Sequence, residues 1–223
     1  MDIVSVDELV KEVRITLDEN QTESSYLETS TDNMELDEII RAKLVDAARS
    51  IIETAPVDLL EASVLPTGTE VVHTNEDGTG YVELPDDFLR LVRFKLKGWK
   101  RAVVYVETEG SEGDEIQRNE FTRGTYIKPA CVFSHDSGGN RIMEYFTAGK
   151  GASGGYDHTV DTALYVPVPS IDNSGGNGTI GIPHLLRPCI VNYCAGLTEV
   201  TRGNSQQADV FFKIATSYYN KNE

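Results

Sequence analysis

The four histidines are the first side chains to consider for catalysis or metal binding: His73, His135, His158 and His184. None of them lies at metal-ligand spacing from a cysteine or from another histidine. The strings SHDSGG and YDHT each place a histidine beside an aspartate, which could bind a metal or transfer a proton. An enzyme that uses His135 or His158 with that aspartate is therefore one hypothesis. Because a metal site needs converging ligands, which this spacing does not supply, we expect loop residues, no bound metal and no cofactor.

Other nucleophiles and acids are equally isolated in the sequence. Asp86 and Asp87 form an acid pair, but their setting is more typical of the cap of a helical turn. Cys131 lies in the apolar run ACVFSH without a neighbouring general base, which predicts a buried thiol. Ser153 lies in the run GKGASGG, which lacks the Gly-Lys-Ser/Thr ending of a phosphate-binding loop and predicts an open loop. The acidic run ETEGSEGDE lacks the ligand spacing of a calcium loop and is interpreted as a solvated loop. The sequence therefore predicts no catalytic residue and no enzymatic activity.

The charge balance of the chain limits its partners. The chain has 223 residues and carries 36 acids against 20 lysines and arginines, a formal net charge of -16. Such acidity repels nucleic-acid phosphates, which argues against tight wrapping of DNA or RNA. No stretch approaches an apolar membrane span, and the start shows no secretory-signal pattern. With three cysteines, we expect reduced thiols and synthesis in a cytoplasm.

Positive charge is concentrated in residues 84–106, LPDDFLRLVRFKLKGWKRAVVYV, around the only tryptophan of the chain. Apolar and basic residues alternate from Val92 to Lys97, which predicts a strand with one apolar and one basic face. Lys97 and Gly98 suit a two-residue turn. We therefore expect residues 99–106 to return as the partner strand of a hairpin.

This hairpin has two interpretations. In the first, it is a half-buried sheet edge whose lysines face solvent and oppose aggregation. In the second, its basic face docks on a protein partner, because residues 1–62 hold sixteen acids against five bases and because arginine and tryptophan are favoured at interface hot spots. The candidate interface residues in the second interpretation are Arg90, Arg93, Lys95, Lys97, Trp99, Lys100 and Arg101.

Four helical patterns flank a β-rich middle region. Apolar stripes at a period of 3.6 predict helices at residues 6–18 and 34–54. Two further helices are expected after Pro183, with Gly203 as the terminator between them. Seven short runs between residues 66 and 182 predict strands, and the strings NEDGTG and DSGGN suit hairpin turns.

These patterns together predict an α+β fold: a helical bundle built from the N- and C-terminal helices, with a long β-rich insertion. The reason is that four helices with one apolar stripe each must bury those stripes against one another. The expected division is N-terminal helices at residues 1–62, the β-rich insertion at 63–182 and a C-terminal helical hairpin that completes the bundle at 183–223.

The string YVELPDDFLRLVRFKLKGWKRAV resembles the central part of head-to-tail connector proteins, also called adaptors, of tailed bacteriophages. In that family a strand leads into an LP-D-F-R string, and then into a strand and hairpin that end in an aromatic residue. The string IVNYCAGLTEVTRGNSQQADVFFKIATSYYN is similar to the closing helical hairpin of the same proteins. The resemblance covers residues 35–62, 80–105 and 183–221, whereas residues 107–182 depart from the smallest members.

The resemblance implies a structural virion protein at the portal vertex or tail, from a short-tailed phage of the crAss-like kind. Such portal-proximal proteins form rings of about twelve copies that connect the capsid portal to the tail and line the DNA channel. The implied partners are other copies of the chain, the portal protein and other tail or ring proteins, with transient, non-specific passage of phage DNA during genome ejection.

A second function class is a soluble β-rich module that binds a small ligand or a glycan. Aromatic side chains stack on such ligands, and polar groups around them fix the orientation. The aromatic candidates for stacking are Trp99, Tyr105, Tyr126, Tyr145 and Tyr156.

Overall fold

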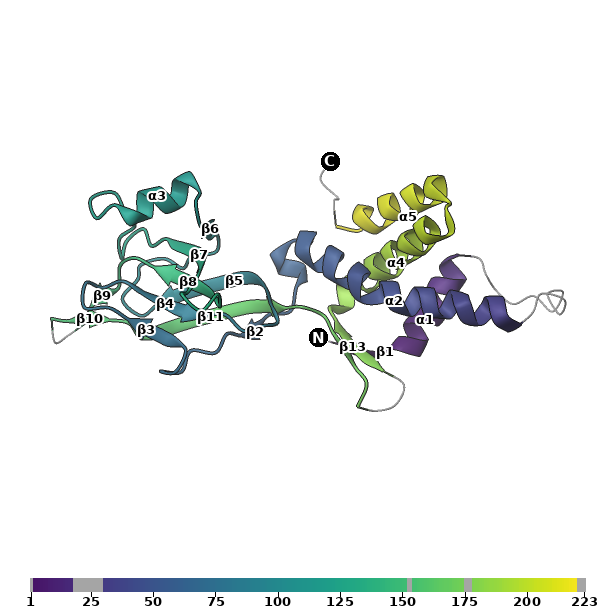
Figure 1. Ribbon diagram of the computed structural model, residues 1–223, viewed down its shortest axis with the longest axis horizontal. Helices are drawn as coiled ribbons and strands as arrows, with labels where there is room; N and C mark the ends of the chain where they lie inside the picture. The colour runs from purple at the N-terminus through teal and green to yellow at the C-terminus, as the bar shows by residue number, and fades with distance from the viewer. Residues whose placement is uncertain (1, 18–29, 152–153, 175–177, 220–223) are drawn as a thin grey trace. The chain divides into compact units, whose positions relative to one another are not determined.

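The computed structural model describes residues 2–17, 30–151, 154–174 and 178–219. The chain forms two compact units (Figure 1). The first unit consists of Met1–Glu61 and Val168–Glu223, so both ends of the sequence contribute to it, and the second consists of Ala62–Pro167. Each unit has its own hydrophobic core.

Helices α1, α2, α4 and α5 and a small sheet make up the first unit. The bounds of its elements are β1 (Asp2–Ser5), α1 (Val6–Thr16), α2 (Ser30–Thr54), the 3-10 turn Val57–Leu59, β12 (Ile171–Asp172), β13 (Thr179–Ile182), the 3-10 turn His184–Leu186, α4 (Arg187–Arg202) and α5 (Ser205–Ser217). The four predicted helices are present. Pro188 lies in the first turn of α4, where its missing N–H costs no hydrogen bond. Gly203 ends α4 in the left-handed conformation, with φ of 87°, as its position in the sequence predicts.

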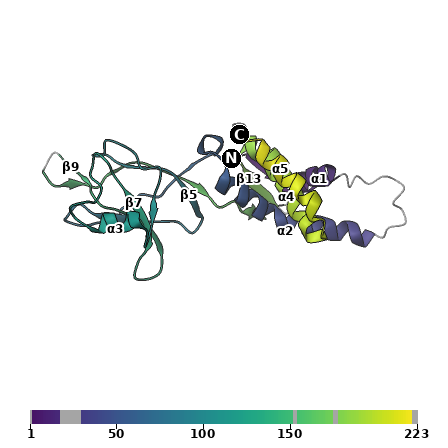
Figure 2. The same ribbon diagram turned by 90° about the horizontal axis from the view of Figure 1, so that it is seen from above.

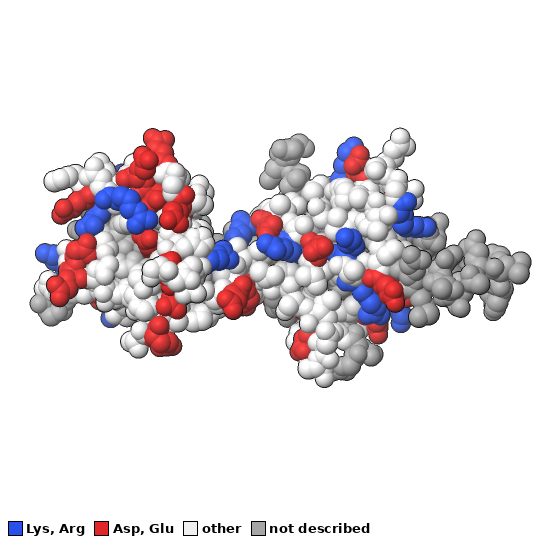
Figure 3. Space-filling view, viewed as in Figure 1, with Lys and Arg blue, Asp and Glu red and all other residues white. Residues whose placement is uncertain are grey.

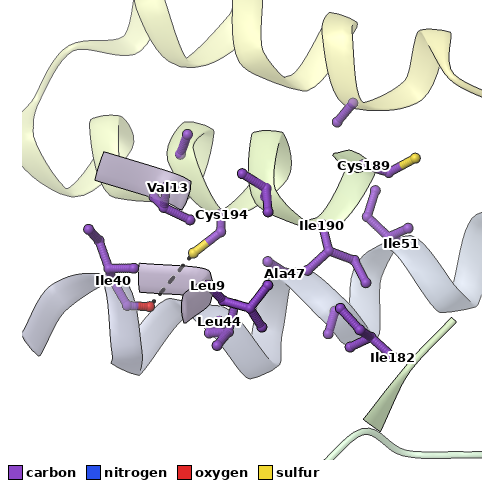
Figure 4. Close-up of a cluster of buried hydrophobic side chains, with 14 of the residues drawn as sticks. Leu9, Val13, Ile40, Leu44, Ala47, Ile51, Ile182, Cys189, Ile190 and Cys194 are labelled. Carbon is purple, nitrogen blue, oxygen red and sulfur yellow. Dashed lines mark hydrogen bonds between the residues drawn. The ribbon is translucent and has the colours of Figure 1, made fainter. Parts of the chain in front are cut away.

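The core of the first unit lies between these helices (Figure 4). Helix α4 packs against α5, α2 and α1, and both ribbon views show α5 beside α4 (Figures 1 and 2). Among the side chains that meet in this core are Leu9 and Val13 of α1, Ile40, Leu44, Ala47 and Ile51 of α2, and Cys189, Ile190 and Cys194 of α4. The Cys194 thiol donates a hydrogen bond to the backbone oxygen of Ile40, at a sulfur–oxygen distance of 3.6 Å.

The prediction of a helical bundle built from the N- and C-terminal helices is wrong. Strands β1, β13 and β12 form an antiparallel three-stranded sheet within the same unit as the helices. Val4 of β1 and Ile180 and Ile182 of β13 are buried in the core of that unit. The helices therefore bury their apolar stripes against strands as well as against one another. A fifth helix, α3, lies in the second unit, so the described residues form an α+β fold of five α-helices and several sheets.

Strands dominate the second unit. The bounds of its elements are β2 (Ser63–Val64), β3 (Val72–Thr74), β4 (Gly80–Glu83), β5 (Phe88–Leu96), β6 (Glu107–Thr108), α3 (Glu112–Arg118), β7 (Cys131–His135), β8 (Arg141–Tyr145), β9 (Gly149–Lys150), β10 (Tyr156–Asp157) and β11 (Val160–Pro167). They form a five-stranded sheet in the order β3-β4-β8-β7-β6, a three-stranded sheet in the order β2-β11-β5, and a β9-β10 pair. The predicted hairpins β3-β4 and β7-β8 are confirmed.

Helix α3 replaces part of the loop predicted for ETEGSEGDE. Ser111 is its N-cap, and the Ser111 hydroxyl accepts a hydrogen bond from the backbone N–H of Asp114. The Asp114 carboxylate in turn accepts a hydrogen bond from Arg118 at 2.7 Å. Arg118 also forms an ion pair with Glu144 of β8, so the helix is attached to the five-stranded sheet.

Candidate interaction surface

Strand β5 carries the first part of the basic segment and pairs antiparallel with β11. Register shifts leave Leu89 and Val92 without an opposite residue in β11, as in β-bulges. Each shift changes the side-chain alternation. As a result Phe88, Leu91 and Phe94 all reach the core although they lie three residues apart. The predicted period of two therefore holds only for the last residues of the strand.

The predicted return strand at residues 99–106 does not form. Of these residues, Val103 makes a single bridge to Phe94 of β5. Trp99 instead turns into the core, where it is 3% exposed and its indole N–H donates a hydrogen bond to the Thr147 carbonyl at 2.7 Å. Its ring also meets Phe94 edge to face. Burial of the indole draws the chain out of the sheet, and Trp99 is a core residue that has no surface to offer a partner.

The six cationic candidates fall into two groups. Arg90 and Lys95 are half-buried, and Lys95 forms an ion pair with Asp161 at 2.9 Å. The other four are exposed and form no ion pair with any residue that the structure describes; they are Arg93, Lys97, Lys100 and Arg101. In so acidic a chain, exposed cations that form no ion pair with the described residues favour contact with an acidic partner.

Large apolar side chains are exposed in the same segment of the chain as two of these cations. Val104 and Tyr105, which follow Arg101 closely, are 67% and 75% exposed. The backbone N–H of Lys100 donates to the Tyr126 carbonyl at 2.9 Å, so a second exposed segment lies alongside. We call the following residues the basic–aromatic surface: Lys100, Arg101, Val104, Tyr105, Tyr126 and Ile127. The sequence pointed to Tyr105 and Tyr126 only as candidates for ligand stacking. Val104 was missed because the run RAVVYVET suited a strand, in which half of the side chains would be buried.

Acidic side chains gather over α3 and β6 on the face of the second unit seen in Figure 3. The acids of these segments that are not buried are Glu107, Glu109, Glu112 and Glu115. Within the described part of the chain, only Glu109 of this group has an ion-pair partner, His135, at 3.5 Å. The cations of the basic–aromatic surface and these acids therefore lie on different segments of the same unit.

The histidines lie apart from one another. His73, His135 and His184 each face one carboxylate. His158 is hydrogen-bonded through Nδ1 to the Tyr145 hydroxyl at 2.8 Å, and burial lowers its pKa. Nowhere in the described ranges do three or more histidine, cysteine, aspartate or glutamate side chains converge on one point.

The other residues considered for catalysis are a buried thiol, two aspartates in a turn and one serine. Cys131 is buried in β7, and burial raises the pKa of its thiol far above the ordinary value. Asp86 and Asp87 lie in the turn before β5, where Asp87 accepts a hydrogen bond from the Tyr165 hydroxyl at 3.1 Å. Ser153 lies outside the described residues. The described side chains thus offer no activated nucleophile among these candidates.

Comparison with known proteins found no relative of the chain. No protein-family model matches the chain, and no curated protein matches it. None of the helices in the described ranges combines the length and the apolar content that a bilayer crossing requires. Because it combines exposed cations with exposed apolar side chains, the basic–aromatic surface is the strongest candidate for a functional contact among the described residues.

Proposed function

We propose that the chain is a structural virion protein that forms a ring between the capsid portal and the tail. The basic–aromatic surface carries this proposal, because it joins exposed cations to exposed apolar side chains in a chain of net charge -16. Exposed apolar groups of this kind mark protein contacts, and tyrosine and arginine are enriched at their energetic centres. The resemblance of residues 80–105 to connector proteins supports the same proposal. Since that segment contains Lys100 and Arg101, the two lines of support overlap.

The separation of charge favours a ring over a two-fold dimer. A two-fold contact centred on the basic–aromatic surface would bring like charges together, which opposes association. A head-to-tail contact instead places this surface against a different, acidic surface of the next copy or of the portal protein. Repeated around an axis, such a contact closes into a ring, here of about twelve copies.

The proposed location is the portal vertex of a short-tailed phage, with the chain made in the host cytoplasm. The ring would line the DNA channel and touch the portal and other tail or ring proteins. Acidic side chains suit such a channel, because phosphates that are repelled from its wall slide past without binding.

Reversal of two charges tests the proposal. In Lys100→Glu/Arg101→Glu, two exposed side chains without ion-pair partners among the described residues change sign, so the fold is expected to stay intact. Each exposed charge contact contributes about 0.2–1 kcal/mol. A loss of about 1–2 kcal/mol per subunit contact weakens that contact about 5- to 30-fold. We expect the variant to be lost from particles and to fail to bind portal-containing particles in a sedimentation assay.

The matched control is Lys11→Glu/Lys213→Glu, which makes the same change of net charge on exposed positions of α1 and α5. We expect this control to assemble as the native chain does. If the Lys100/Arg101 variant also assembles normally, the basic–aromatic surface has no part in the ring. If both variants fail equally, net charge and not this surface governs assembly.

A further inference from the structure

A cleft of about 510 Å³ lies in the second unit, between the segment that leads into β3 and the segment around β10. Its volume falls within the range of small-molecule sites, about 300–1,000 Å³. Its lining residues are Thr67, Thr69, Val72, Thr74, Tyr156, Asp157, His158, Thr159 and Val160. Four of these nine residues are threonines, so the lining is unusually rich in hydroxyl groups.

Three of the threonine hydroxyls are available to a ligand. The hydroxyls of Thr67, Thr69 and Thr74 form no hydrogen bond with any residue in the described ranges, and all three residues are exposed. The fourth threonine, Thr159, donates its backbone N–H to the Asp157 carboxylate at 3.0 Å, and its side chain also interacts with that carboxylate. A hydroxyl both donates and accepts, so three of them together suit a ligand that itself carries hydroxyl groups.

Tyr156 supplies a fixed aromatic ring at this cleft. Its ring packs directly on Gly78, where an added Cβ would lie 2.6 Å from a ring carbon. Gly78 also has φ of 87°, so both the contact with the ring and the backbone conformation disfavour a side chain there. The ring is 40% exposed and meets His158 edge to face. It therefore offers a rigid apolar face beside the free hydroxyls.

The charges around the cleft restrict the class of ligand. Among the described lining residues, Asp157 alone carries a full charge, since burial lowers the pKa of His158 and keeps that ring neutral near pH 7. No lysine or arginine is among these described residues, although Lys97 is close enough to Asp157 to act on it through charge. A phosphate, sulfate or nucleotide would lack a cationic partner among the lining residues. The lining therefore disfavours anions and fits a ligand that is rich in hydroxyls and apolar on one face.

We propose that this threonine cleft binds a neutral pyranose, with one sugar face against Tyr156 and the sugar hydroxyls on Thr67, Thr69 and Thr74. The apolar side chains of Val72 and Val160 complete the lining. The Asp157 carboxylate accepts hydrogen bonds from further sugar hydroxyls. This site is separate from the basic–aromatic surface, and it gives the glycan-binding alternative a location within the second unit.

A second cleft, of about 450 Å³, is less suited to a ligand. It is lined in part by Arg118 and Arg123, but both guanidinium groups already form ion pairs with carboxylates of the same unit. Its polar groups are thus largely occupied, in contrast to the free hydroxyls of the threonine cleft.

The test is saccharide binding by the full chain. An array of neutral glycans, followed by saturation-transfer NMR and calorimetry with methyl α-glucopyranoside, methyl β-galactopyranoside and N-acetylglucosamine, gives the native affinity. For one pyranose we expect a Kd on the order of 1 mM. Thr67→Ala/Thr69→Ala/Thr74→Ala should weaken binding at least tenfold, and so should Tyr156→Ala.

The controls are an exposed threonine and an exposed tyrosine outside the cleft. Thr108→Ala and Tyr105→Ala lie in the same unit and should change the affinity less than twofold. Absence of binding to every neutral glycan overturns the proposal, as does binding that the cleft variants leave unchanged in a folded protein. Because Tyr105 belongs to the basic–aromatic surface and not to the cleft, ring assembly and sugar binding can fail independently.

Discussion

Trp99→Ala distinguishes a core tryptophan from a tryptophan that docks on a partner. The indole is 3% exposed and packs against the rings of Phe94 and Tyr145, with centroid separations of 5.6 and 6.3 Å. Its N–H satisfies the Thr147 carbonyl. Truncation therefore leaves a cavity in the core of the second unit and removes a buried hydrogen bond.

The expected cost is large. Truncation of a buried tryptophan to alanine costs about 3–5 kcal/mol. At about 1.4 kcal/mol per factor of ten, this raises the opening equilibrium of the second unit by about a hundredfold to several thousandfold. Tyr105→Ala removes a side chain that is 75% exposed and should change stability by less than about 0.5 kcal/mol.

Hydrogen exchange followed by mass spectrometry measures this difference in each unit separately. Peptides from β5 and β8 should lose protection in Trp99→Ala by the factor above, while peptides from α2 and α4 serve as an internal reference. Protection within threefold of the native value, together with a loss of assembly, would show that Trp99 acts at a surface and that the core placement is mistaken.

Two further predictions concern the first unit. Gly203→Ala places a side chain at φ of 87°, so it should lower stability in thermal unfolding by about 1–2 kcal/mol. The control Gly155→Ala has open space around the new side chain and no positive φ, so it should lower stability by less than about 0.5 kcal/mol. Equal losses of stability in the two variants would contradict the role of the backbone conformation. Burial raises the pKa of Cys189 to about 11 and that of Cys194 to about 12. Since unfolded thiols ionise above about pH 8.5 while the folded ones stay protonated, stability falls as pH rises from there toward 11. Urea unfolding measures the free energy of unfolding at pH 7 and at pH 10. From pH 7 to pH 10 this free energy should fall less in Cys189→Ala/Cys194→Ala than in the native chain, and an identical fall would refute this cause.

Local chemistry made much of the fold predictable. The apolar stripe of α2, the terminator Gly203 and the turn strings NEDGTG and DSGGN each act over a few neighbouring residues, and the structure has the expected element at each. Helix α3 had a usable signal, since Ser111 precedes acids that suit a first turn. With seven residues and no apolar stripe, it gave no periodicity to detect.

The wrong predictions concern parts of the fold that depend on contacts between residues far apart in the sequence. β5 pairs with β11, which begins at Val160, and no property of residues 88–96 indicates that partner or the bulge at Val92. The pairing of β1 with β13 joins strands that lie far apart in the sequence, and it supplies core side chains that helix patterns cannot anticipate. Four of the six cations of the basic segment are exposed, whereas the inward turn of Trp99 depends on tertiary packing with Thr147.

The most direct test of the connector proposal is the content and symmetry of the portal vertex in purified particles of the source phage. Mass spectrometry should find the chain in those particles, and electron cryomicroscopy should place about twelve copies in a ring below the portal. In that ring Lys100 and Tyr105 should lie at a contact with the next copy or with the portal protein. Particles that lack the chain, or a ring in which both side chains face solvent, would contradict the proposal.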